Sequence, residues 1–245
     1  MASPSQGQML GLGRIIVFLL PLIPSSMTLA PLGNVLPLYY AKSTAVTLAT
    51  LGSVLFLTRI TDAFADQLIG YWSDATRSRF GRRKPWIAFG AVVASAGSWY
   101  LYTPPPNAGG TYLFVSLSLV YLGWSLMMVP HHAWMAELTR TYEERTLVAS
   151  VAALTAPLGM ILVLLAPFLP IFPTTEFTGE TLAFVGAAIC IMLPLTTGLA
   201  LWFVPDSSVP LPTRTTAGMT VRAILANKPF RNFLAVFLIA AFVTG

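Results

Sequence analysis

Long apolar runs separated by short polar segments are the main pattern of this 245-residue chain. A membrane-spanning helix needs about 20 predominantly apolar residues. Runs of roughly this length cover residues 12–40, 45–72, 85–102, 111–135, 147–171 and 182–204. The runs do not alternate between apolar and polar positions, which excludes the strands of an outer-membrane barrel. The pattern therefore predicts an all-α polytopic membrane protein with a six-helix bundle.

After the sixth run the chain becomes polar and then apolar again. Residues 205–231 hold four prolines and four basic residues, and we expect a cytoplasmic linker there. Residues 232–245 begin another apolar run, but at 1.5 Å per residue they reach only about 21 Å of a hydrocarbon core of about 30 Å. We therefore expect a six-helix bundle over 1–204, the linker over 205–231 and the truncated start of a seventh helix over 232–245. This plan is typical of one half of a secondary transporter.

The composition is that of a membrane protein and excludes several soluble classes. Hydrophobic residues make up 56% of the chain and charged residues only 9%, whereas a soluble domain carries about 25% charged residues. A disordered chain, a disulfide scaffold and an ordinary cytosolic enzyme are therefore excluded. The single cysteine, Cys190, cannot form a disulfide within the chain.

The basic residues predict the orientation in the membrane. If the N-terminus is cytoplasmic, all but two of the 14 Lys and Arg residues lie inside the cell, with Lys42 outside and Arg59 within the membrane. This bias follows the positive-inside rule and predicts a multi-pass protein of the cell (inner) membrane. Because the bases occupy loops between spans, the net charge of +5 does not indicate a nucleic-acid partner. The expected partners are the lipid bilayer and a small organic solute.

Three ionisable residues, Arg59, Asp62 and Asp66, lie inside the second run. Their spacing puts them on one face of a helix, and ionisable groups at bilayer depth usually face a cavity. Two carboxylates four residues apart in a low dielectric resist double ionisation, so a proton or a small cation would relieve their repulsion. Since one base cannot match two acids, a cation site is favoured over a purely structural Arg–Asp pair.

The segment between the second and third runs is strongly basic. It reads SDATRSRFGRRKPW over residues 73–86, where Gly81 and the spaced arginines predict a tight, charged turn, and DAFAD precedes it at residues 62–66. These residues resemble the signature loop of the major facilitator superfamily. The longer form is similar to that of the glycoside–pentoside–hexuronide:cation symporter family. The segments VPHHAWMAELTRTYEERT at 129–146 and NKPFRNFL at 227–234 are similar to segments of the same family, so the chain resembles its N-terminal half.

The resemblance implies roles for individual residues. The acids of the second helix that bind the coupling cation in this family match Asp62 and Asp66, and the accompanying arginine matches Arg59. Loop residues that hold the cytoplasmic side closed match Asp74, Arg77, Arg79, Arg82 and Arg83, with Glu137, Glu144 and Arg145 beside them. The implied function is cation-coupled symport of a small organic solute by alternating access, with the solute at the membrane midplane between two halves. No catalytic residue, cofactor or metal site is expected.

The predicted substrate-binding residues differ from those of sugar-transporting family members. Leu22, Met128 and Ala152 stand where those members present charged residues that hold the sugar. A sugar hydroxyl buried against an apolar side chain stays unpaired, at a cost of about 1–3 kcal/mol. We therefore expect a solute less polar than a disaccharide, including amphipathic solutes, as in family members that carry lysophospholipids. The residues predicted to line the substrate cavity are Trp124, Met128, His131 and Trp134.

The coupling ion is expected to be H⁺, with Na⁺ as the alternative. Sodium requires several oxygen ligands, but Ala63, Phe64 and Ala65 between the two acids offer no side-chain oxygen. A proton needs only one carboxylate.

Other functions and another partner stay open at this stage. A non-transporting membrane scaffold or a lipid-handling protein could use the same fold. An intramembrane enzyme is less favoured, since the spans lack a nucleophile–base pair. The bundle is expected to pair with a second six-helix half, either later in the same chain or in a second copy if the chain ends at Gly245.

Overall fold

The computed structural model describes residues 11–139, 141–206, 226–228, 231–232 and 236. The chain divides into two compact units, Met1–Ser208 and Val209–Gly245. Most of the predicted linker (205–231) and of the predicted seventh helix (232–245) lies outside the described residues. In the second unit the described residues Ala226, Lys228, Arg231, Asn232 and Val236 are helical.

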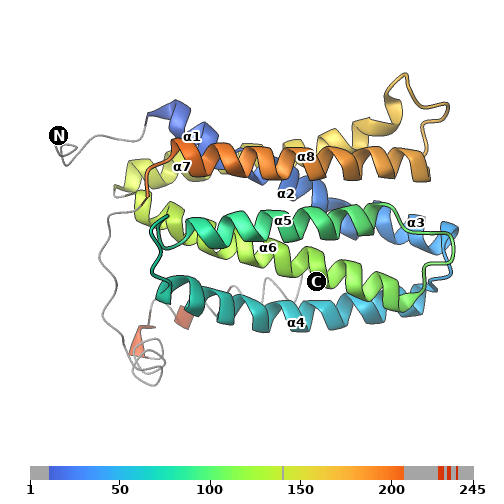
Figure 1. The fold of residues 1–245 in the computed structure, drawn as a ribbon, viewed down its shortest axis with the longest axis horizontal. Helices are drawn as coiled ribbons and strands as arrows, with labels where there is room; N and C mark the ends of the chain where they lie inside the picture. Colours follow the sequence, from blue (N-terminus) through green and yellow to red (C-terminus); the bar gives the residue numbers. More distant parts are fainter. Residues whose placement is uncertain (1–10, 140, 207–225, 229–230, 233–235, 237–245) are drawn as a thin grey trace. The chain divides into compact units, whose positions relative to one another are not determined.

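The first unit is built from helices (Figure 1). They are α1 (Leu12–Leu19), α2 (Leu22–Leu29), η1 (Ala30–Gly33), α3 (Val35–Ser43), α4 (Leu48–Ala75), α5 (Lys84–Tyr102), α6 (Gly110–Leu138), α7 (Tyr142–Leu165), η2 (Ala166–Phe168) and α8 (Gly179–Phe203). The residues that the structure describes contain no strand. The first predicted run corresponds to α1–α3, and α4 to α8 follow the other five runs within a few residues. The predicted all-α fold is confirmed.

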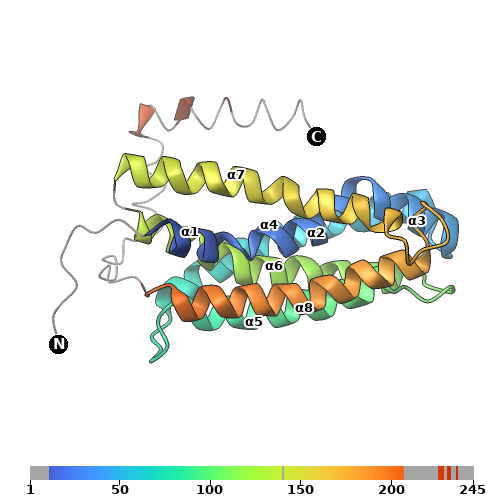
Figure 2. The same ribbon diagram turned by 90° about the horizontal axis from the view of Figure 1, so that it is seen from above.

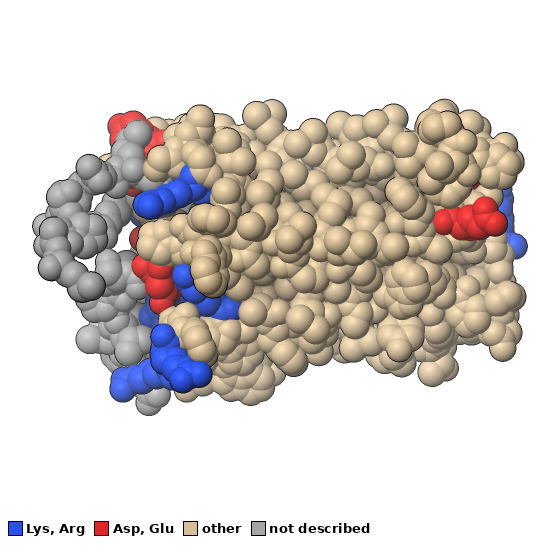
Figure 3. Space-filling model, turned by 45° about the horizontal axis from the view of Figure 1, so that its top comes forward, with Lys and Arg blue, Asp and Glu red and all other residues tan. Residues whose placement is uncertain are grey.

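Five stretches of the described chain are long and apolar enough to cross a membrane. They are Leu12–Gly33, Leu48–Ala75, Gly110–Leu138, Tyr142–Phe168 and Gly179–Phe203. α5, which follows the third predicted run, is not among them. On the face drawn in Figure 3, charged side chains gather at the two ends and the surface between them lacks charge. This distribution is the one that a bundle crossing a bilayer requires.

α5 and α6 form the closest helix pair of the first unit. α5 lies between α6 and α8, α4 packs along α6, and α7 packs on α2 (Figures 1 and 2). A Cβ atom at Gly90 would lie 2.5 Å from the backbone N of Met127, and one at Gly97 would lie 2.7 Å from that of Val120. Small residues of this kind allow two helix backbones to approach. α4 and α7 lie at the margins of the unit and leave most of their residues exposed.

The first predicted run is broken into short helices, because its prolines lack the backbone N–H that continues a helix. Pro31 cannot donate to the Met27 carbonyl four residues earlier. The Tyr102 hydroxyl of α5 donates to that carbonyl at 2.7 Å and to the Thr28 carbonyl at 3.2 Å. At the break between α1 and α2, Nε2 of His131 on α6 donates to the Phe18 carbonyl at 2.9 Å. Neighbouring helices thus satisfy backbone groups that the breaks release.

We expect Tyr102→Phe to lower the thermal stability of the protein in detergent. Tyr102 is 0% exposed, so the Met27 carbonyl would lose its donor with no water to replace it, at a cost of about 1–3 kcal/mol. Tyr112→Phe is the matched control, because the Tyr112 hydroxyl donates to the Tyr100 carbonyl at an exposed site. Unfolding midpoints followed by size-exclusion chromatography after heating should fall for Tyr102→Phe only. Equal midpoints for the two variants would contradict this account of the break.

Candidate functional site: the polar face of α4 and the charged loop

α4 carries the three intramembrane ionisable residues near its middle. The helix begins after Thr47, whose hydroxyl accepts a hydrogen bond from the Thr50 N–H at 3.2 Å. Asp62 and Asp66 are half-buried, and Arg59 is exposed. The contact of α4 with α6 decides which partners these side chains meet.

The two acids have different surroundings. Oδ1 of Asp62 accepts a hydrogen bond from the Ser125 hydroxyl on α6 at 2.8 Å. Oδ1 of Asp66 is buried without a hydrogen-bond partner in the described structure. Asp66 is therefore an acid with an unsatisfied oxygen in a helix that is long and apolar enough to cross a membrane.

Arg59 is directed to an aromatic ring and not to the acids. Its guanidinium lies 4.9 Å from the ring centroid of Tyr121 on α6, a distance typical of a cation–π contact. Among the described residues it forms no ion pair with Asp62 or Asp66. The structural alternative, a buried Arg–Asp pair, is therefore not seen in this conformation.

The sequence alone does not single out Ser125 or Tyr121. Both lie in α6, which also contains Ser116 and Ser118. Tyr121 and Ser125 are four positions apart on α6, and Arg59 and Asp62 are three positions apart on α4. Each pair therefore lies on one face of its own helix. Which hydroxyl of α6 reaches Asp62 depends on how the two helices pack, and a single helix pattern does not contain that information.

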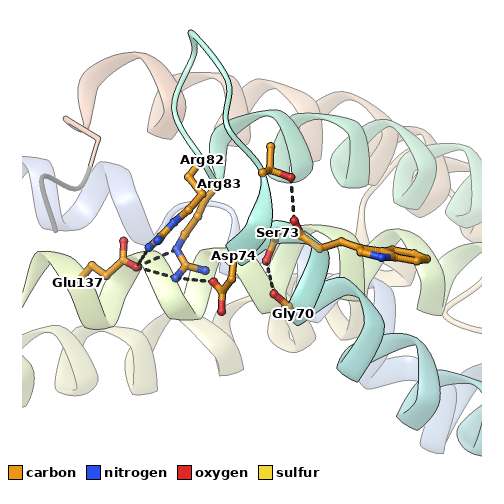
Figure 4. A network of polar contacts seen from close by, with 8 residues as sticks. Gly70, Ser73, Asp74, Arg82, Arg83 and Glu137 are labelled. Carbon is orange, nitrogen blue, oxygen red and sulfur yellow. Dashed lines mark hydrogen bonds and ion pairs between the residues drawn. The ribbon is translucent and has the colours of Figure 1, made fainter. Parts of the chain in front are cut away.

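A charged network joins the ends of α4, α5 and α6 (Figure 4). Nη2 of Arg83 lies 3.0 Å from Oδ1 of Asp74 and 2.6 Å from Oε1 of Glu137. Arg82 also pairs with Glu137. Asp74 stands in the last turn of α4, Arg83 just before α5, and Glu137 in the last turn of α6. Because Arg83 is only 6% exposed, removal of either acid would leave a largely buried charge underpaired.

The turn before this network requires a glycine. Gly81 has a φ of +100°, a conformation that glycine adopts without the steric cost that a Cβ atom imposes. A Cβ atom at this position would also collide with the Asp206 carboxylate. The predicted tight turn is confirmed, and it brings Arg82 and Arg83 back toward Glu137.

The other residues predicted to gate the cytoplasmic side lie outside this network. Arg77 and Arg79 are exposed, and the Arg79 guanidinium lies 4.6 Å from the ring centroid of Phe80. Glu144 forms a capping box with Thr141 at the start of α7, with both hydrogen bonds at 3.2 Å. Nε of Arg145 donates to the Thr139 carbonyl at 3.4 Å. Glu144 and Arg145 therefore shape the turn between α6 and α7.

Most of the residues predicted to line the substrate cavity are packed inside the bundle. Met128, His131 and Trp134 are buried, and Trp124 is half-buried against the same core. The His131 ring stacks on Phe18 at 4.2 Å, and Trp134 meets Phe18 edge-on at 5.1 Å. α6 touches α4 and α5 along much of its length, so few of its side chains reach the surface. In this conformation His131 and Trp134 join α6 to Phe18 of α1.

Comparison with known proteins identifies the family. A family model described as MFS/sugar transport protein matches residues 17–245. The uncharacterized symporter YnaJ of Bacillus subtilis is 32% identical over 148 residues, which are 58% of this chain and 31% of YnaJ. The glucuronide carrier protein homolog of Escherichia coli is 25% identical over 127 residues, 50% of this chain and 28% of that protein. The sodium-dependent lysophosphatidylcholine symporter 1 of Mus musculus is 26% identical over 140 residues, 56% of this chain and 26% of that protein.

The matched segments span less than a third of the length of each of these curated relatives. The family model, in contrast, covers nearly the whole of this chain. It confirms the resemblance of the basic loop and its neighbours to the major facilitator superfamily. The chain is a multi-pass membrane protein that belongs to the MFS/sugar transport protein family, a family of transporters and not of enzymes.

Proposed function

We propose that this chain forms the N-terminal half of a symporter that couples a cation to the movement of a small organic solute by alternating access. The observation that carries the proposal is the pair of acids on α4. Asp62 and Asp66 lie at bilayer depth, Arg59 pairs with neither among the described residues, and one oxygen of Asp66 is buried without a partner. Binding a cation there relieves the cost of two carboxylates in a low dielectric.

The proposed solute site lies on the exposed face of α4 and the neighbouring part of α6. Arg59, Thr61 and Gln67 are exposed on α4, and a charged group at bilayer depth avoids acyl chains. This face therefore suits a water-filled cavity shared with a second six-helix half, from the same chain or from a second copy. Trp124 is the accessible member of the proposed lining, and Met128, His131 and Trp134 are buried residues of the same helix.

The proposed solute is less polar than a disaccharide. Leu22 and Ala152 pack against the core and Met128 belongs to it, so these positions offer no charged group to a sugar. The names of the relatives include a glucuronide carrier homolog and a lysophosphatidylcholine symporter. An amphipathic solute fits the apolar substitutions better than a fully hydroxylated one.

The proposed orientation puts the N-terminus and the charged network on the cytoplasmic side of the inner membrane. Asp74, Arg82, Arg83 and Glu137 would then hold that side closed, with Arg77, Arg79, Glu144 and Arg145 at the same end. The domain plan of a bundle over 1–204, a linker over 205–231 and a seventh helix from 232 is part of this proposal.

We propose H⁺ as the coupling ion. A single protonated carboxylate suffices for H⁺, whereas Na⁺ needs several oxygen ligands. The Ser125 hydroxyl, 2.8 Å from Asp62, adds one oxygen beside the acids. That contact makes Na⁺ the second candidate, in which Asp62, Asp66 and Ser125 would share the ion.

The experiment is solute uptake into proteoliposomes under an imposed pH gradient or an imposed Na⁺ gradient, each alone. An alkyl glycoside and a lysophospholipid serve as the test solutes. We expect uptake to follow the pH gradient and to be unaffected by Na⁺. Uptake that follows only Na⁺ would overturn the choice of H⁺. Uptake that follows neither gradient would overturn symport of these solutes and favour a scaffold or a lipid-handling protein.

A further inference from the structure

We infer that a groove between α5 and α8, beside the basic loop, binds the headgroup of an anionic phospholipid. The groove has a volume of about 400 Å³ and lies between the first turn of α5 and the last turns of α8. One side is lined by Phe80, Lys84 and Ala88, and the other by Gly198, Leu201 and Trp202. None of these residues belongs to the proposed transport site.

The surface that continues from the groove along both helices is apolar. Phe89 and Val92 of α5 are exposed there, as are Ile191 and Leu195 of α8. The intramembrane charges lie on a different helix, α4. α5 and α8 therefore present a face that suits acyl chains, and an occupant of the groove needs an apolar part that lies along this face.

Aromatic rings mark the level of the groove in the membrane. Trp202 is 85% exposed and Phe80 is 64% exposed. Tryptophan side chains collect where the acyl region meets the headgroups. Gly198 leaves open space between Trp202 and Phe80, since a Cβ atom built there meets nothing within 4 Å. The open part of the groove thus lies where a lipid passes from acyl chain to headgroup.

The charge of the groove selects the type of headgroup. Nζ of Lys84 donates to the Leu201 and Val204 carbonyls, both at 2.8 Å, which holds the ammonium group between the two helices. The ammonium group also lies 5.3 Å from the ring centroid of Trp134, so Lys84 contributes a fixed positive charge at the wall of the groove. Among the described residues, no carboxylate lies within 4.0 Å of Lys84 or of Arg79.

Arg79 adds a second positive charge at the rim of the groove. Its guanidinium lies over the ring of Phe80 at 4.6 Å, and Phe80 lines the groove. The Asp206 carboxylate, near Gly81, acts on Lys84 and offsets part of its charge. One carboxylate does not balance both bases. Basic groups between helices on the cytoplasmic side are the recognised pattern for anionic lipid headgroups.

The test uses Trp202 as the reporter. The full chain is reconstituted in phosphatidylcholine vesicles that contain increasing fractions of brominated phosphatidylglycerol or brominated phosphatidylcholine. The quenching of Trp202 is the difference between the wild-type protein and Trp202→Phe. We expect half-maximal quenching at a several-fold lower fraction of phosphatidylglycerol than of phosphatidylcholine.

Charge variants show whether the preference for phosphatidylglycerol arises at the groove. Lys84→Gln would also remove the hydrogen bonds from Lys84 to the Leu201 and Val204 carbonyls at the end of α8. Arg79→Gln is therefore the main variant. One basic group near an anionic lipid contributes about fivefold in affinity. Lys42→Gln is the matched control, because exposed Lys42 lies in the last turn of α3, at the opposite end of α4 from the loop. We expect Arg79→Gln to weaken quenching by phosphatidylglycerol about fivefold and Lys42→Gln to leave it unchanged. Equal quenching by both lipids, or an equal loss in both variants, would overturn the proposal.

Discussion

Asp62→Asn and Asp66→Asn should each abolish cation-driven accumulation of the solute. An amide has nearly the shape of a carboxylate but neither takes up a proton at neutral pH nor offers a negative charge to a cation. With one-to-one coupling, a gradient of one pH unit corresponds to about 1.4 kcal/mol and hence to about tenfold accumulation. In either variant the solute should reach only its equilibrium distribution. Solute uptake into proteoliposomes measures the difference in accumulation between the wild-type protein and each variant.

The control for this experiment is an acid outside the proposed site. Glu180→Gln makes the same chemical change in the first turn of α8, where Glu180 is exposed, and should leave accumulation unchanged. Insertion and folding of all three variants are checked by size-exclusion chromatography. Full concentrative uptake by both aspartate variants would show that the cation does not bind at this pair.

Gly90→Ala should destabilise the bundle more than a single added methyl group usually does. The new Cβ atom would lie 2.5 Å from the backbone N of Met127, and a backbone atom, unlike a side chain, cannot rotate away. α5 and α6 would have to move apart along their closest contact. Overpacking of this kind costs about 1–3 kcal/mol, so we expect the unfolding midpoint in detergent to fall by several degrees.

Gly52→Ala provides the comparison on a neighbouring helix. A Cβ atom at Gly52 meets nothing within 4 Å, and alanine favours a helix over glycine by about 1 kcal/mol. The midpoint of this variant should stay equal or rise. A midpoint for Gly90→Ala as high as that of Gly52→Ala would mean that the α5–α6 contact tolerates separation without cost.

Some features of the site follow from one helix and could be predicted from its residues. The face shared by Asp62 and Asp66 depends only on the helical period, and the turn at Gly81 depends only on the freedom of glycine at positive φ. The break in the first run follows from prolines that lack an N–H. Hydrogen-bond partners on other helices could not be predicted in this way. Tyr102 and His131 satisfy the Met27 and Phe18 carbonyls, and no pattern within residues 12–40 names either of them.

The charged loop shows the same division between local and tertiary information. Arg77, Arg79, Arg82 and Arg83 have the same charge and lie within seven residues of sequence. Only Arg82 and Arg83 reach Glu137, because the turn at Gly81 directs them toward α6. Arg79 instead lies over Phe80, at the rim of the groove proposed for a lipid. Sequence similarity assigned all four arginines to one gate, whereas in the structure Arg82 and Arg83 join the charged network and Arg79 lies apart from it.

The sequence by itself determined the class of the protein, the approximate ends of helices α4 to α8, and the helix that carries Arg59, Asp62 and Asp66. These properties depend on hydrophobicity, helical period and backbone chemistry, which act over one or a few turns. The tertiary structure decided that Asp62 meets Ser125, that Arg59 meets Tyr121, and that Met128, His131 and Trp134 are packed inside. Those contacts depend on the rotation and separation of whole helices, which the glycines at the α5–α6 contact and the position of α6 within the bundle control. Local sequence patterns cannot specify these contacts, because the energy of a contact between two helices depends on both helix surfaces together.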